Sequence, residues 1–296
     1  MSLRHVLTLL VLLSQSPVFA APPPAAAPVR LRWKLPEQKP LGFALTLQNV
    51  DPRSNEVRFN FEAFKDTRRT SERRQAILSF KQPQSASMVA VLSPKPSGDL
   101  AAKVVVTRVE VPKKGHSSRA SKQIAQAMKK MEGTVQLRGS MTDRGFVTSD
   151  LKREQRNLLA ILFELPSPPV SVGDTWTHSA DLVKMGRGWE GDGETISRLQ
   201  LVELQKQADG RTLAVIDITL AERQEGTFTG PRGRKLPSMM EISFVGQGEF
   251  LVEEGRWKQL TGRMATEATG IMEANTEQQF LFTPLESIPP EVLAAE

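Results

Sequence analysis

The 296-residue chain contains no cysteine. This absence excludes disulfides, thiolate metal sites and a cysteine nucleophile, and it also excludes the lipidated cysteine that tethers bacterial lipoproteins to a membrane. The folded protein must therefore be held together by a hydrophobic core, because no covalent cross-link is available.

Histidine is nearly as scarce, and only His116 and His178 follow the N-terminal region. The chain has no HxH or HExxH spacing for zinc and no GxSxG turn for a hydrolase nucleophile. His116 adjoins Ser117 and Ser118, but neighbouring residues on a basic connector do not form a preorganised Ser/His pair. We predict that His116 is solvated and that His178 is a surface or edge residue. The sequence thus predicts no catalytic residue, no metal ligand and no cofactor.

Two glycine-containing stretches invite a functional interpretation. In WEGDGE, which starts at Trp189, Glu190, Asp192 and Glu194 alternate with glycines, but the stretch lacks the further oxygen ligands of an EF-hand loop. We predict a turn between strands, and the sequence leaves calcium binding open. GPRGRK, from Gly230, lacks the spacing of a phosphate loop and predicts a basic loop.

The N-terminus has the pattern of a secretory signal peptide. In MSLRHVLTLLVLLSQSPVFAA, one basic residue, Arg4, precedes an apolar run over Val6–Leu13 and a small-residue ending. The pattern predicts a signal peptide over residues 1–21, cleaved near Ala20/Ala21, and therefore export to the periplasm or the extracellular space. Because a spanning helix needs about 20 apolar residues, no transmembrane segment is expected in the mature chain.

The charge balance is mildly basic. The full chain has a formal net charge of +6, and without the predicted signal peptide, which carries one basic and no acidic residue, 38 Lys and Arg face 33 Asp and Glu. Nucleic acid is not expected as a partner, because the exported chain has no tyrosine and little aromatic interleaving. The basic clusters suit anionic lipid headgroups or, alternatively, solvated loops and strand edges. They are Arg30/Arg32/Lys34, Arg68/Arg69/Arg73/Arg74, Lys113/Lys114/Arg119/Lys122 and Arg232/Arg234/Lys235.

The dominant sequence period from residue 30 onward is two. Residues 22–29 form a Pro/Ala-rich spacer that predicts disorder, and residues 30–296 predict a single β-rich domain. Asp209-Gly210 and Glu254-Gly255 predict hairpin turns. Alternating strands are expected over Leu41–Leu47, Val57–Phe61, Ser87–Leu92, Val104–Val111, Val135–Met141, Leu199–Gln205, Leu213–Leu220, Glu241–Val252, Leu260–Thr269 and Thr276–Phe282.

Two segments follow the helical period instead. Ser117–Met131 places an apolar stripe beside lysines, with Ser117 or Ser118 as N-cap, and Ser149–Leu165 has leucines at similar spacing, with Ser149 or Asp150 as N-cap. The expected fold is mainly β (α+β): a large curved antiparallel sheet or half-barrel with two amphipathic helices. Weak internal sequence similarity leaves open that the domain consists of two related halves that meet near residues 165–176.

The most patterned stretch is LPSPPVSVGDTW, over Leu165–Trp176. We interpret it as a structural join between the two parts of the sheet: Pro166 ends the preceding helix, and Pro169 helps to hold an extended crossing. The residues that carry this structural motif are Pro166, Pro169, Val170, Val172, Gly173, Asp174 and Trp176.

The second half of this motif predicts specific packing. Val170 and Val172 should alternate into the core, and Gly173 with Asp174 should form a turn in which the Asp174 carboxylate accepts a backbone N–H. Trp176 should then bury a large apolar surface.

The pattern LPxxPVxVGDxW, which starts at Leu165, resembles that of a family of secreted or lipid-anchored β-rich bacterial envelope proteins, a domain of unknown function. The glycine-rich strand and hairpin over Gly246–Gly262 are similar to that family as well. The resemblance implies an envelope location and the position of the motif after a helix, where it opens the second half of the domain. The family has no established activity or catalytic residues to carry over.

Three function classes follow from these observations. The leading hypothesis is a non-catalytic envelope protein that binds a lipid or another apolar or amphipathic ligand, because a curved sheet under an amphipathic helix can enclose such a ligand. The alternative is a structural or protein-interaction module whose partner is an envelope protein. A hydrolase is the third. The oligomeric state is not encoded in any recognisable feature.

Overall fold

The computed structural model of the chain describes residues 27–36, 39–51, 55–60, 77–112, 119–183, 185, 188–230 and 233–295. The predicted signal peptide, most of the predicted spacer and His116 lie outside the described residues.

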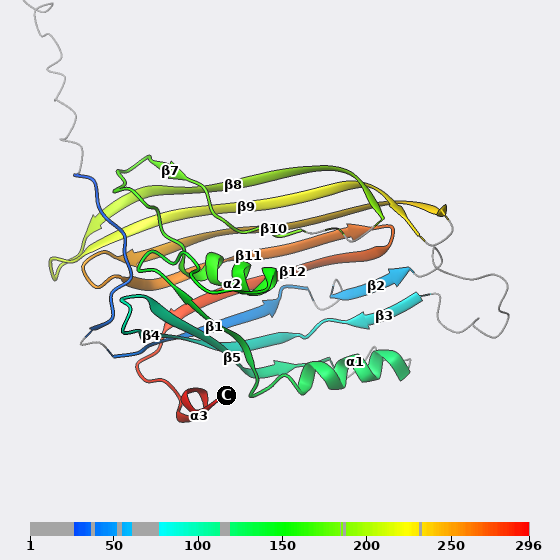
Figure 1. Cartoon of the computed structure of the whole chain (residues 1–296), viewed down its shortest axis with the longest axis horizontal. Helices are drawn as coiled ribbons and strands as arrows, with labels where there is room; N and C mark the ends of the chain where they lie inside the picture. The colour runs from blue at the N-terminus through cyan, green and yellow to red at the C-terminus, as the bar shows by residue number, and fades with distance from the viewer. Residues whose placement is uncertain are drawn as a thin grey trace, which may run out of the picture.

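The described strands form one open, curved sheet in which every pair is antiparallel (Figure 1). This finding confirms the predicted fold class. From one edge to the other, the strands are β6 (Val135–Met141), β5 (Leu100–Glu110), β4 (Ser85–Pro94), β1 (Leu41–Asn49), β12 (Met272–Pro284), β11 (Arg256–Thr269), β10 (Lys235–Leu251), β9 (Thr212–Thr229), β8 (Trp189–Lys206) and β7 (Thr175–Trp176). Two further strands continue from β12, namely β2 (Glu56–Asn60) and β3 (Ile77–Lys81).

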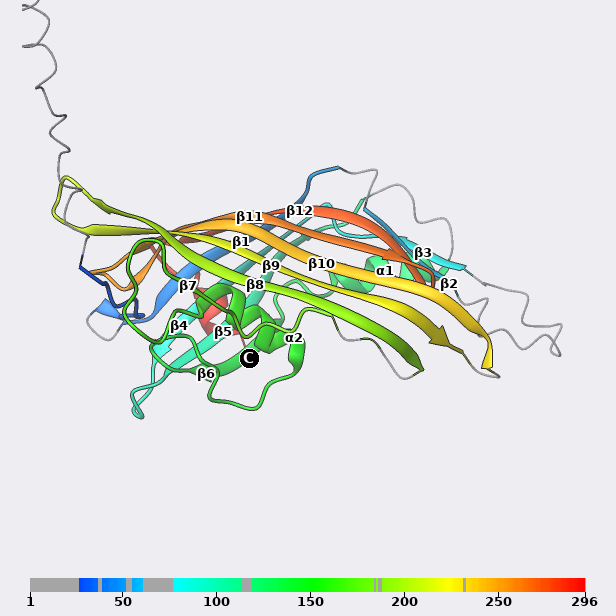
Figure 2. The same cartoon turned by 90° about the horizontal axis from the view of Figure 1, so that it is seen from above.

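Within the described residues, three helices accompany the sheet. The two predicted helices are α1 (Arg119–Lys129) and α2 (Arg153–Phe163), and α2 lies against the concave face (Figure 2). The short helix α3 (Pro290–Ala294) was not predicted; it covers the opposite, convex face, where Val292 packs on valines of β4 and β5. No described helix combines the length and apolar composition needed to cross a membrane.

Several boundaries differ from the sequence-based expectation. Helix α2 begins at Arg153 rather than directly after Ser149 or Asp150, because the Ser149 hydroxyl accepts the Ser140 N–H at the outer edge of β6. Strands β8, β9 and β10 are longer than predicted, since their far ends lack the regular apolar/polar alternation that marks a half-buried strand. Strand β3 was also missed.

The core fills the concave face beneath α2. Trp33 packs edge-on against the rings of Phe43, Phe163 and Phe250 at centroid distances of 5.2–5.8 Å. Its indole N–H donates to the Phe163 carbonyl at 2.6 Å, and that of Trp257 donates to the Leu162 carbonyl at 2.8 Å. Both carbonyls belong to the last turn of α2, which has no helical donors left for them. The two tryptophans therefore fix the end of this helix to the sheet.

Paired glycines allow the strands to approach one another on the concave side. Gly246 of β10 lies opposite Gly262 of β11, and Gly191 of β8 lies opposite Gly226 of β9. A Cβ atom on Gly246 would lie 2.3 Å from the backbone oxygen of Thr261. Side chains at these positions would push the strands apart, so the glycines permit the tight curvature visible in Figure 2.

We predict that Gly246→Ala lowers the free energy of unfolding by about 1–3 kcal/mol, because the added methyl meets rigid backbone. Urea denaturation followed by circular dichroism would measure the loss. Gly193→Ala is the matched control: its Cβ would meet only the end of the flexible Gln224 side chain. Equal stability losses in the two variants would contradict the proposed role of the glycine pair.

Candidate functional site: an apolar groove and a strap on the concave face

The LPSPPVSVGDTW motif connects the end of α2 to the edge strand β7. Pro166 is buried after the helix end, and Pro169 is exposed. Val170 is buried and exchanges backbone hydrogen bonds of 2.8 and 2.9 Å with Val29, so it lies in the core as predicted. The prediction for Val172 is wrong: its side chain is 49% exposed, because the turn that follows carries the chain away from the core.

The turn itself has the predicted chemistry. Gly173 has a φ of +95°, and the Asp174 carboxylate accepts the Ser171 backbone N–H at 2.8 Å. Trp176 pairs with Leu199 of β8 and packs against the main core, but it is half-buried rather than fully buried. Asp174 is thus occupied in a local turn, and the motif acts as a structural join.

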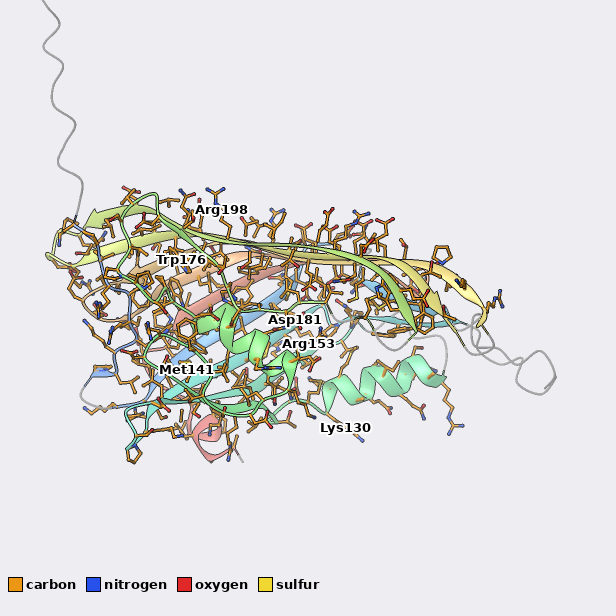
Figure 3. The ribbon with its side chains drawn as sticks, turned by 45° about the horizontal axis from the view of Figure 1, so that its top comes forward. Lys130, Met141, Arg153, Trp176, Asp181 and Arg198 are labelled. Atoms are coloured by element: carbon orange, nitrogen blue, oxygen red, sulfur yellow. The ribbon has the colours of Figure 1, made fainter. Side chains whose placement is uncertain are left out.

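An apolar groove of about 270 Å³ opens between the C-terminal end of α1 and the N-terminal half of α2, which follow one another along the sheet (Figure 3). Side chains from both helices and from β4, β5 and β6 form its walls. Most of them are apolar, and three are methionines. The lining residues are Pro83, Ala86, Met88, Val106, Val109, Met128, Met131, Gln136, Glu154, Gln155 and Leu158.

Two other surface cavities are more polar. One, of about 490 Å³, lies beside α3, where Lys103 and Arg138 donate to the helix's C-terminal carbonyls. Burial, and next the positive charge of Arg138, lower the pKa of Lys103. The other, of about 380 Å³, contains Glu164 and His178. Charged walls suit an apolar ligand poorly, which leaves the groove between α1 and α2 as the candidate binding site.

A strap over Thr177–Val183 crosses the concave face between β7 and β8; Figure 3 labels Trp176 before it and Asp181 within it. The buried carboxylate of Glu222 on β9 accepts the N–H groups of Leu182 and Val183 at 2.8 and 3.0 Å. On α2, the Asn157 side chain exchanges two hydrogen bonds with the Asp181 backbone. The strap is therefore attached to both the sheet and the helix.

Glu164, at the end of α2, is a second buried carboxylate that holds the strap. It accepts the Ser179 backbone N–H at 3.1 Å and also the Ser179 hydroxyl. Sequence reasoning missed both acids. The sequence pattern could have revealed Glu222, because this residue continues the alternation of core-facing positions set by Ile216, Ile218 and Leu220.

His178 lies on the strap and is half-buried at the cavity that it shares with Glu164, rather than fully on the surface. Burial lowers its pKa, and the nearby Glu164 and a hydrogen bond to the Ala160 carbonyl oppose that shift only in part. Its Nδ1 accepts the Ala180 N–H at 3.2 Å. The Ser179 hydroxyl donates to Glu164, so His178 does not form a Ser/His pair with Ser179.

The WEGDGE stretch is not a turn, as we had predicted, but the first part of strand β8. Glu190, Asp192 and Glu194 occupy alternate positions and thus project from one face of the strand. Within the described residues, no group of three or more His, Cys, Asp or Glu side chains is placed to hold a metal ion.

The described members of the basic clusters make separate local contacts. Arg32 forms an ion pair of 2.7 Å with Asp143, and Lys34 donates to the Glu253 carbonyl. In GPRGRK, the Gly230 N–H bonds to the Arg234 carbonyl in a turn between β9 and β10, as predicted. The cluster residues that lie outside the described parts of the chain are Arg68, Arg69, Arg73, Arg74, Lys113, Lys114 and Arg232.

No protein-family model, curated protein or solved structure matches this chain. Function must therefore be argued from the groove, the strap and the surfaces of the sheet.

We predict that the protein loses stability as the pH falls from about 7.5 to about 5.5, and that His178→Gln loses less over the same range. The pKa of His178 is lowered in the folded state. At pH values between the folded-state and unfolded-state pKa, the unfolded chain therefore binds a proton at His178 that the folded chain does not. The contribution of neutral His178 to the free energy of unfolding is present above the unfolded-state pKa of about 6.5. It disappears as the pH drops through the pKa of the folded state.

Chemical denaturation at the two pH values would measure this effect. Asn157→Ala is the control, since it removes hydrogen bonds to the strap without removing a titratable group. An identical pH dependence in wild type and His178→Gln would contradict the prediction.

Proposed function

We propose that this chain is an exported, non-catalytic binding protein that holds the apolar part of a small amphipathic ligand in the groove between α1 and α2. The observation that carries the proposal is the groove itself: a concave, mainly apolar surface built from two helices and three strands. Ligand sites in proteins typically have this character, with a few polar groups at the rim.

The size of the groove supports a ligand of limited apolar bulk. Its volume of about 270 Å³ lies just below the range of about 300–1,000 Å³ that is typical of small-molecule sites. A single alkyl or acyl chain suits such a volume better than a two-chain lipid. The polar part of the ligand would lie at the open mouth, where Gln136, Glu154 and Gln155 offer donors and acceptors.

Methionines make the groove adaptable. Met88, Met128 and Met131 line it, and Met131 is 39% exposed although its side chain is large and apolar. Unbranched thioether side chains adjust to ligands of different shape at low cost, and they recur at promiscuous binding surfaces. A site for a class of amphiphiles is therefore favoured over a site for one rigid compound.

The envelope location is part of the same proposal. It is supported by the signal-peptide pattern over residues 1–21 and by the resemblance of the Leu165–Trp176 motif to secreted or lipid-anchored envelope proteins. Export would bring an amphiphile-binding protein to the compartment where membrane lipids and their breakdown products are available.

A protein-interaction role is the second candidate. The specific observation in its favour is a long stretch of strand β8 whose outer edge is not paired with another described strand. The two roles do not compete for residues, since the groove involves β4, β5 and β6 at the opposite side of the sheet.

We predict that Ala86→Phe weakens binding of the fluorescent apolar probe N-phenylnaphthylamine at least about tenfold, which corresponds to about 1.4 kcal/mol. The added ring would occupy the groove that Ala86 lines. Fluorescence titration of the purified mature protein would measure the change.

The matched control is Ala221→Phe, which places the same ring on the convex side of β9 and should leave the affinity unchanged. Unaltered probe binding in Ala86→Phe, with the fold intact by circular dichroism, would overturn the proposed site.

A further inference from the structure

The first part of β8 is a free sheet edge. Its inner neighbour is β9, whereas β7 pairs only with Leu199 and Gln200. The backbone of Leu201 bonds outward, to Gly173 and Asp174, at 2.8 and 3.1 Å. Because bonding direction alternates along a strand, the N–H and C=O groups of Gly191, Gly193 and Thr195 point outward too, toward no described strand.

This edge carries exposed acidic side chains but, within the described residues, lacks the other usual protections against pairing. Natural edges are shortened, bulged, covered, or occupied by proline and lysine. The register of β8 against β9 runs from Trp189 to Leu201 without a shift, and the stretch contains neither proline nor lysine. All seven residues of Glu190–Ile196 are exposed, including Ile196 at 55%. The strand is thus regular and accessible at the same time.

The opposite edge of the same sheet shows how this fold closes an edge. There the Ser149 hydroxyl accepts the Ser140 N–H of β6 at 3.0 Å. The Gln155 side chain donates to the Gln136 carbonyl at 2.9 Å. Side chains from the following loop and from α2 therefore occupy backbone groups of β6, and no described segment does the same for residues 190–196 of β8.

The charges along the free edge define which strand could join it. Glu190, Asp192 and Glu194 project from the convex face, and Asp192 lies directly opposite Glu225 of β9. Arg223 pairs with Glu225 at 2.8 Å and approaches Glu241 at 3.6 Å. Among the described residues, no cation lies within ion-pair distance of Glu190 or Asp192. Glu190 and Asp192 are therefore left without counter-charges at the outermost position of the sheet, whereas Glu194 lies opposite Arg223 of β9.

We propose that the edge of β8 over Glu190–Ile196 is a docking site for an extended segment of another protein, which adds to the sheet as a further strand. Strand addition derives its affinity from main-chain hydrogen bonds and its specificity from alternate side chains. On the convex face the incoming strand carries Lys or Arg at alternate positions, opposite the acids. On the concave face, Gly191 and Gly193 present no side chain of their own to the incoming strand, and the flexible Gln224 side chain covers Gly193.

A second copy of this chain does not fit the same edge. Two β8 strands paired through a twofold axis would place their acidic rows on the same face, with like charges opposite each other. This arrangement is destabilising, so the acidic row disfavours self-pairing and selects a basic partner.

Selection of short random peptides displayed on phage against the mature protein would test the proposal. We expect enrichment of peptides with Lys or Arg at every second position. Thr195→Pro should weaken their binding at least about tenfold, because it removes an outward N–H and leaves the ladder to β9 intact. Thr195→Ala, which keeps that N–H, should bind as the wild type does.

Charge reversal provides a second test that does not depend on how well the proline variant folds. In Glu190→Lys combined with Asp192→Lys, the basic peptides should lose at least about tenfold in affinity. N-phenylnaphthylamine binding should be unchanged in every edge variant, which separates this site from the groove. No enrichment of alternating basic peptides, or equal binding to all variants, would overturn the proposal.

Discussion

Two tryptophan indoles hold the last turn of α2 against the sheet, and the concave face is organised around this contact. Trp33 and Trp257 reach the carbonyls of Phe163 and Leu162 from opposite ends of the chain. A helix end buried without donors would be costly, so these bonds allow α2 to end inside the core. Once that end is fixed, Glu164 is positioned to hold the strap, and the N-terminal half of α2 is left to form one wall of the groove.

Local periodicity predicted most elements, because burial on one side of a sheet or helix imposes a pattern on neighbouring residues. It did not predict which distant elements meet. Trp33 and Phe163 are separated by 130 positions and Trp257 and Leu162 by 95, so nothing local marks those contacts. His178 shows the limit clearly: a histidine on a polar segment suggests a surface position, and only the tertiary fold places it beside Glu164.

The candidate groove was predictable only in outline. Met128 and Met131 were recognisable in the sequence as adaptable apolar residues, but a groove exists because α1 and α2 meet the sheet with space between them. That space depends on the geometry of strands β4 to β6, which a sequence pattern does not encode. The β8 edge was missed for a different reason: glycines and acids at alternate positions lack apolar alternation, and this composition resembles a turn.

The two edges of the sheet differ in how far other elements cover them. At the β6 side, α2, α3 and the loop before α2 cover both faces and the edge, so this part of the molecule can support a stable apolar groove. At the β8 side, Glu190–Ile196 is exposed on both faces and is held by β9 alone. A strand in that position gains little from burial, and its unpaired backbone would be stabilised by another strand. The same sheet therefore combines a rigid side suited to a small ligand with an incomplete side suited to a polypeptide.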